Sequence, residues 1–137
     1  MEKYHHLGIV VADIDRAIKS YIQIYPSYKM IAREAVKSEM VEIALVSDGY
    51  FTVEFVCPLN EKSPVSAFLK KGGGIHHVCF VTNSIDEYFE KNKEDIKIIK
   101  GKHIGFFDST TAFFVQRNFD SGMLLYELVE QNCKEFG

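Results

Sequence analysis

The sequence predicts an α+β fold in which two tandem βαβββ modules form a curved mixed sheet around a metal-binding cleft. The first observation is an internal repeat, which is a strong sign of how a chain is organised. The stretch around His76-His77 repeats the stretch around His5-His6, 71 residues earlier, and an apolar run follows both histidine pairs. The second observation is that Leu124–Val129 repeats Phe51–Val56 with a shift of 73 residues. Each module therefore has histidines near its start and a strand-borne glutamate near its end.

The length of the chain bounds the number of domains. A chain of 137 residues fits one domain. We expect a single domain over 1–137, with module 1 over about residues 3–58, a linker helix over 59–73 and module 2 over about 74–131. Its hydrophobic content of 47% is enough for a packed core.

The composition argues against several classes of partner. The net charge is −3 and the basic residues are dispersed, so we expect no nucleic acid. No apolar run approaches the ~18 residues that a membrane span needs, so we expect no membrane partner. The three cysteines are odd in number and too few for a disulfide framework, which favours a reducing compartment. The N-terminus has no signal-peptide pattern, so we expect a cytoplasmic protein.

Module 1 begins with a strand at 4–11, where alternation gives way to an apolar run. A helix follows, with Asp13 as its N-cap and Pro26 ending it. Its apolar face is spaced as one side of a helix: Ile14, Ala17, Ile18, Tyr21, Ile22 and Tyr25. A short strand is expected at 28–33 and a polar loop at 34–39.

A hairpin is predicted next, from strands at 40–46 and 51–57. A three-residue loop with Gly49 in the left-handed conformation would place Glu42 directly opposite Glu54, on one face of the sheet. A two-residue loop would instead place the two carboxylates on opposite faces. Two adjacent carboxylates repel unless a cation or a proton lies between them, so the loop length decides what this hairpin can do.

Module 2 repeats the order of module 1 after the linker helix. The linker helix has Ser63 as its cap, Pro64 at its first position and glycines after its last turn. The expected elements of module 2 are a strand at 75–82, a helix opened by the capping box Ser84–Glu87, a strand at 96–100, a loop at 103–109, and strands at 111–116 and 123–130 around a turn at 118–122.

Four residues of the repeat are equivalent in pairs: His6 with His77, and Glu54 with Glu127. Neighbours along a strand face opposite ways, so only one histidine of each doublet can face the cleft. Two imidazoles and two carboxylates suit one divalent metal ion such as Zn, Ni, Co or Mn. The alternative is two satisfied histidines at sheet ends and two edge glutamates.

Glu42 has no acidic counterpart in module 2 and lies among apolar residues. It is either an edge residue facing water or a general base, because a partly buried carboxylate suits proton transfer near neutral pH. Gly8 and Cys79 follow the histidine doublets. Their small side chains either leave room for a ligand beside a metal or reflect ordinary tight packing.

The chain resembles the vicinal oxygen chelate superfamily over nearly its whole length, and the methylmalonyl-CoA epimerase branch most of all. The resemblance is carried by His6–Ile14, by Val53–Val65 and by Gly74–Val78, where a Pro-Leu, Ser-Pro and Phe-Leu run ends in a glycine-rich His-His strand. By position, it implies metal ligation by His6, Glu54, His77 and Glu127, and catalytic carboxylates at Glu42 and Glu127.

The resemblance implies a divalent-metal-dependent enzyme that moves a proton at C2 of an acyl-CoA thioester. Glu42 would take the proton on one face and Glu127 would return one on the other. The alternative is a glyoxalase I-like lyase for a thiol hemithioacetal, in which Glu54 and Glu127 carry the proton. A second alternative is a non-enzymatic small-molecule binding or resistance protein. The resemblance also implies a homodimer. The stretch His103–Ser109 departs from the epimerase pattern and leaves the acyl group and thiol carrier open.

Overall fold

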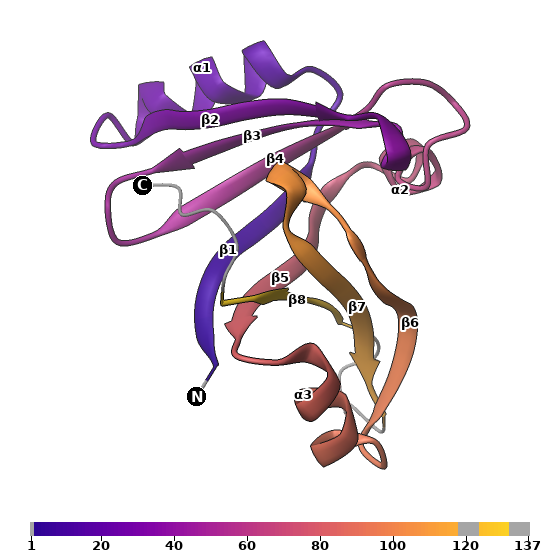
Figure 1. Cartoon of the computed structure of the whole chain (residues 1–137). Helices are drawn as coiled ribbons and strands as arrows, with labels where there is room; N and C mark the ends of the chain where they lie inside the picture. Colours follow the sequence, from indigo (N-terminus) through magenta and orange to yellow (C-terminus); the bar gives the residue numbers. More distant parts are fainter. Residues whose placement is uncertain (1, 118–123, 132–137) are drawn as a thin grey trace. The chain divides into compact units, whose positions relative to one another are not determined.

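The computed structural model describes residues 2–117 and 124–131 (Figure 1). In this part of the chain the βαβββ order occurs twice, which confirms the predicted α+β class. The first copy consists of β1 (Lys3–Val10), α1 (Ile14–Ile24), β2 (Lys29–Val36), β3 (Val41–Ser47) and β4 (Thr52–Pro58). After α2 (Ser66–Lys70), the second copy consists of β5 (Gly74–Thr82), α3 (Ile85–Asn92), β6 (Ile96–Ile104), β7 (Thr110–Gln116) and β8 (Leu125–Glu130).

The described residues fall into two compact units. Residues 6–76 form the N-terminal unit, and residues 2–5, 77–117 and 124–131 form the C-terminal unit. The strand order is β2-β3-β4-β1 in the first copy and β5-β8-β7-β6 in the second. In both sets one pair is parallel (β1 with β4, β5 with β8) and the other two pairs are antiparallel. Across the described residues, no helix is long and apolar enough to cross a membrane.

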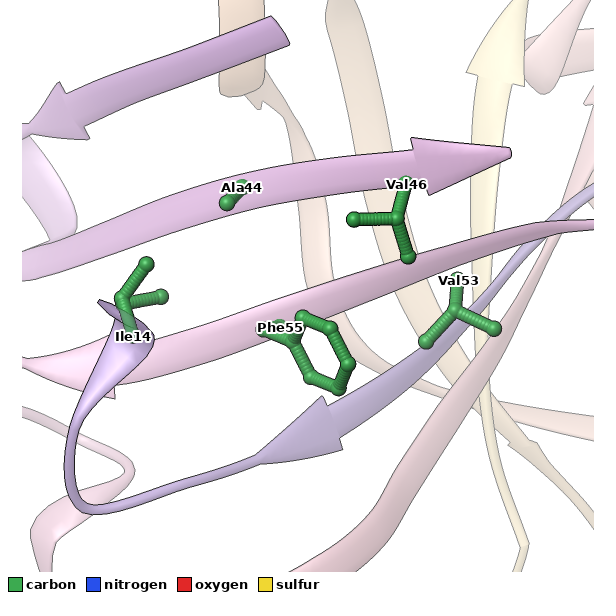
Figure 2. Packing of buried hydrophobic residues seen from close by; sticks show 5 residues of the cluster. All are labelled: Ile14, Ala44, Val46, Val53 and Phe55. Atoms are coloured by element: carbon green, nitrogen blue, oxygen red, sulfur yellow. The ribbon is translucent and has the colours of Figure 1, made fainter. Parts of the chain in front are cut away.

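In the N-terminal unit, α1 covers one face of the sheet formed by β2, β3 and β4 (Figure 1). Asp13 caps the helix as predicted, because its Oδ1 accepts the backbone N–H of Arg16 at 3.0 Å. The buried cluster in Figure 2 joins one helix residue to alternate residues of two strands: Ile14, Ala44, Val46, Val53 and Phe55. Residues between them, including Leu45 and Glu54, therefore point to the opposite face.

The C-terminal unit repeats this packing with α3. Ser84 caps the helix, with its Oγ accepting the backbone N–H of Glu87 at 3.1 Å, which confirms the predicted capping position. The buried cluster here consists of Ile85, Ile96, Ala112, Phe114 and Leu128. One face of this sheet is thus covered by α3, and alternate residues such as Glu127 lie on the other face.

Three boundaries differ from the sequence predictions. β2 runs to Val36, into the expected loop, because it pairs with β3 as far as Val41. β6 likewise runs to Ile104, with two register shifts against β7. The predicted cap at Ser63 is wrong, since α2 begins at Ser66, and the Ser63 hydroxyl accepts the N–H of Val65, at 3.4 Å, outside the helix. The turn predicted at 118–122 lies outside the described residues.

Candidate metal centre

The N-terminal unit holds a buried pair of His6 and Glu54. β1 and β4 run parallel, with Gly8 as the Cα partner of Glu54, so His6 lies on the same face two residues earlier. His6 Nε2 is 3.5 Å from Glu54 Oε1, and both side chains are almost fully buried. An ionised carboxylate buried this deeply needs a compensating charge, which a protonated imidazole or a bound cation supplies.

The C-terminal unit holds the equivalent pair of His77 and Glu127. β5 and β8 run parallel with Cys79 as the Cα partner of Glu127. His77 Nε2 is 3.2 Å from Glu127 Oε1, again with both side chains buried. The other carboxylate oxygen of Glu127 accepts the Thr111 hydroxyl at 2.8 Å. The same hydroxyl lies 2.7 Å from the Leu128 carbonyl oxygen, so its one hydrogen is shared between these two acceptors. The contact with Thr111 restricts the rotation of the carboxylate.

Each pair has the spacing of two donor atoms on one ion. Zinc binds imidazole nitrogen and carboxylate oxygen at about 2.0–2.2 Å, so two such donors lie about 3.4 Å apart in a tetrahedral site and about 3.0 Å apart in an octahedral one. The observed separations of 3.5 Å and 3.2 Å match that range. The donor set of nitrogen and oxygen therefore fits a divalent metal.

The other histidine of each doublet packs on an aromatic ring. His76 lies edge-on to Phe68, with ring centroids 4.9 Å apart, and His5 lies 5.7 Å from Phe106. Both are half-buried and precede the buried histidines in their strands. Strand alternation turns them to the opposite face, as the sequence predicted.

Neither of the two loop lengths considered for the hairpin, two or three residues, is found. The loop between β3 and β4 is Asp48–Phe51, and Ser47 pairs with Thr52. Asp48 closes this loop, because its carboxylate accepts the backbone N–H of Phe51 at 2.8 Å and of the residue before it at 2.9 Å. These hydrogen bonds lower the pKa of Asp48 below its ordinary value, with the bond from Phe51 as the largest cause.

The four-residue loop turns Glu42 away from Glu54. The Cα partner of Glu54 is Leu45, and the partner of Glu42 is Cys57. The two carboxylates therefore lie on opposite faces of the sheet, and Glu42 shares its face with Ala44, under α1.

Glu42 is part of an ion-pair network on that face. Arg33 Nε donates to Glu42 Oε2 at 2.9 Å, and its Nη1 donates to Asp15 Oδ1 at 2.6 Å. Arg33 thus links β2, β3 and the first turn of α1. The hydrogen bond from Arg33 lowers the pKa of Asp15, and the Arg33 charge adds to the effect. The catalytic role predicted for Glu42 stays a prediction, and its position gives it a structural role.

The sequence did not point to Thr111 or to Phe113. Thr111 is fully buried and holds Glu127, and it is found only once the register of β7 against β8 is known. Phe113 is the Cα partner of Glu127, and its ring lies edge-on to His77 with centroids 5.9 Å apart. Thr111 and Phe113 are two positions apart in β7, so strand alternation places their side chains on the same face of the sheet.

The repeated fold and the two His/Glu pairs define the class: a tandem βαβββ protein with buried metal-type donors in each copy. The chain belongs to the Glyoxalase/Bleomycin resistance protein/Dioxygenase superfamily, which its residues 5–114 match. This result confirms the resemblance to the vicinal oxygen chelate group.

Curated relatives carry both assigned and unassigned functions. An uncharacterized protein of Bacillus subtilis is 33% identical over 66% of this chain and 64% of its own length. Human mitochondrial methylmalonyl-CoA epimerase is 31% identical over 61% of this chain and 48% of its own length. The chain thus spans about half the length of the human enzyme.

Solved structures match the fold more completely. A hypothetical protein of Bacillus halodurans has a TM-score of 0.86 at 29% identity, covering 98% of this chain and 97% of that one. Methylmalonyl-CoA epimerase in complex with methylmalonyl-CoA and NH4+ has a TM-score of 0.79 at 25% identity, covering 96% of both chains. Epimerases therefore share the fold of this chain.

Proposed function

We propose that the chain is a divalent-metal-dependent enzyme that transfers a proton at the carbon next to a carbonyl, with an acyl-CoA thioester as substrate. One metal ion would be held by His6, Glu54, His77 and Glu127. The observation that carries the proposal is the pair of buried His/Glu partners with metal-type spacing, in a chain whose relatives include methylmalonyl-CoA epimerases.

A metal in such a site polarises a carbonyl as a Lewis acid. The protein residues supply the proton transfer. Glu127 is the proposed proton carrier, because its contact with Thr111 restricts the rotation of its carboxylate. A second carboxylate is needed for inversion, since a single base returns the proton mostly to the face it came from. Glu54 is the candidate for this second carboxylate, because it lies on the same face of its sheet as His6.

The direct test is deuterium incorporation at C2 of methylmalonyl-CoA in D2O, with Zn, Ni, Co and Mn supplied in turn. We expect exchange that depends on the metal, and its loss in Glu127→Gln with folding retained. Metal-independent exchange, or full exchange in Glu127→Gln, contradicts the proposal. A metal-free, inactive protein whose fold is unchanged by His77→Ala would support the non-enzymatic alternative.

A glyoxalase-type lyase is the second candidate, because the β3 register leaves Glu54 and Glu127 as the carboxylates available for either reaction. The residues of β3 that share a face with Leu45 are Val41, Ile43 and Ser47, so β3 offers no carboxylate beside Glu54. Proton transfer by Glu54 and Glu127 alone is what the glyoxalase route requires. Turnover of methylglyoxal with a thiol, in the absence of exchange on methylmalonyl-CoA, would select this candidate. The proposed homodimer is tested separately by analytical ultracentrifugation.

A further inference from the structure

The C-terminal unit has a hollow on the face of its sheet that packs against α3. The hollow encloses about 430 Å³, and its aromatic wall comes from four elements: Phe80 of β5, Tyr88 of α3, Phe114 of β7 and Tyr126 of β8. Tyr126 directly precedes Glu127 in β8, so strand alternation puts the two side chains on opposite faces. The hollow is therefore separate from the His77–Glu127 pair.

The two copies of the repeat fill this part of the helix–sheet interface differently. In the N-terminal unit, Tyr21 fills the corresponding place: its ring lies 4.9 Å from that of Tyr28 and 5.6 Å from that of Phe55. The 71-residue shift puts Asn92 at the position of Tyr21. Asp95 directly precedes β6, as Tyr28 directly precedes β2. Two short polar side chains thus stand where the first copy has two aromatic rings.

The aromatic wall has one buried ring and three partly exposed rings. Phe114 is buried and stacks on Tyr126, with centroids 5.1 Å apart and planes at 10°, so these two rings cover each other's faces. Phe80 lies 6.3 Å from Tyr126, with its ring tilted by 32°. The rings of Phe80, Tyr88 and Tyr126 are only partly buried, so they supply the aromatic surface of the hollow, and such surface attracts other rings and cations.

The rim carries more acid than base. Glu2 and Asp95 contribute carboxylates, and Arg117 contributes one cation whose Nε donates to the Ile96 carbonyl at 2.8 Å. The Glu2 carboxylate is held in place, because its Oε2 accepts the Thr82 hydroxyl at 3.0 Å.

Glu2 stands where two hollows meet. A neighbouring hollow of about 340 Å³ shares Glu2, Tyr88 and Asn92 with the first. The pKa of the Tyr88 hydroxyl is raised, first by burial and then by the negative charge of Glu2. Negative charge and aromatic surface are therefore adjacent in this part of the unit.

We propose that this hollow is a binding site for a small planar aromatic molecule that carries a protonated amine. The ring would pack against the partly exposed rings of Phe80, Tyr88 and Tyr126, and the ammonium group would pair with Glu2. A volume of about 430 Å³ lies within the range of small-molecule sites, which is roughly 300–1,000 Å³. The site does not depend on the metal centre or on the proposed reaction.

Tryptamine is a suitable probe, because the chain contains no tryptophan and the indole fluorescence reports binding directly. Indole-3-propionate keeps the ring and reverses the charge, and hexylamine keeps the charge and lacks the ring. We expect saturable 1:1 binding of tryptamine, and binding of both control compounds weaker by at least about tenfold. Binding should be the same with and without a metal chelator.

Two variants and one control locate the site. Asn92→Tyr supplies the ring that Tyr21 supplies in the first copy, and it should abolish binding. The control Glu90→Tyr adds the same side chain at an exposed position of α3 and should leave binding unchanged. Glu2→Gln changes an exposed residue outside the core and should weaken tryptamine binding by about fivefold or more, without weakening the binding of the anion indole-3-propionate. No saturable tryptamine binding, or wild-type affinity in Glu2→Gln, overturns the proposal whatever happens to Asn92→Tyr.

Discussion

The replacement Glu42→Gln tests whether the Glu42 carboxylate has a structural role or a catalytic one. Glu42 lies on the α1 side of the sheet and accepts the Arg33 guanidinium at 2.9 Å, with each side chain about one-third exposed. A solvent-exposed ion pair of this kind contributes about 0.2–1 kcal/mol. The amide of Gln keeps one acceptor for Arg33 and removes the charge, so the free energy of unfolding should fall by no more than about 1 kcal/mol.

The effect on activity should be equally small. Loss of a general base typically costs about 10²–10⁴-fold in rate. Since the Glu42 carboxylate faces away from Glu54, we expect the exchange rate of Glu42→Gln to stay within about threefold of wild type, a change that corresponds to less than 1 kcal/mol in the barrier. The assay is C2 deuterium exchange, run beside urea unfolding of the same samples.

Arg33→Gln is a second variant of the same network, because it breaks the pair with Glu42 from the other side and also the pair with Asp15. It should lower stability at least as much as Glu42→Gln and leave exchange unchanged. A loss of exchange by a factor of a hundred or more in Glu42→Gln, with unfolding and metal content unchanged, would refute the structural interpretation and return Glu42 to the role of base.

Three further outcomes test other parts of the account. Thr111→Val removes the hydroxyl that contacts the Glu127 carboxylate, so we expect proton transfer to be slower, with kcat lower by about tenfold. The bound metal should be retained, and the free energy of unfolding should fall by about 1–3 kcal/mol. An unchanged kcat would contradict the positioning role of Thr111. Gly73→Ala should destabilise the protein more than Gly72→Ala does, because both positions have positive φ but only the Cβ at Gly73 would meet a backbone carbonyl oxygen, at 2.7 Å; equal losses in thermal unfolding would argue against that contact. Asp48 has a lowered pKa in the folded state, so its carboxylate stabilises the fold at pH values above its ordinary pKa of 3.8, and this stabilisation is lost as the pH falls through the folded-state pKa. Asp48→Ala should therefore lose less unfolding free energy on acidification than wild type does. Parallel plots of unfolding free energy against pH for the two proteins would contradict this.

The repeat was enough to predict most of the fold. The His-His strands, the helix caps at Asp13 and Ser84 and the βαβββ order all depend on local patterns, and each was found where the sequence placed it. The equivalence of Glu54 and Glu127 also followed from the repeat, and both are buried beside a histidine. Local periodicity suffices here because alternation decides which face a strand residue occupies.

Features that depend on register or on packing were not predictable. The face of Glu42 depends on whether its hairpin loop has an odd or even number of residues. The Asp48 hydrogen bonds that close the four-residue loop are local, but an Asp-Gly turn is compatible with several loop lengths. The extension of β2 to Val36 reflects its pairing with β3, which takes in the first three residues of the stretch that was expected to be a loop. The hollow beside α3 depends on how the side chains around Asn92 pack, and side-chain packing cannot be read from the sequence.

The central claim is that the two His/Glu pairs hold one metal ion together. Its most direct test is the metal content of purified protein after dialysis against Zn, Ni, Co or Mn, measured by plasma mass spectrometry for wild type, His6→Ala and His77→Ala. One shared site predicts one equivalent of metal per chain in wild type and none in either variant, with the fold of both variants checked by circular dichroism. Two equivalents in wild type and one in each variant would mean that each pair binds its own ion, and would contradict the shared site.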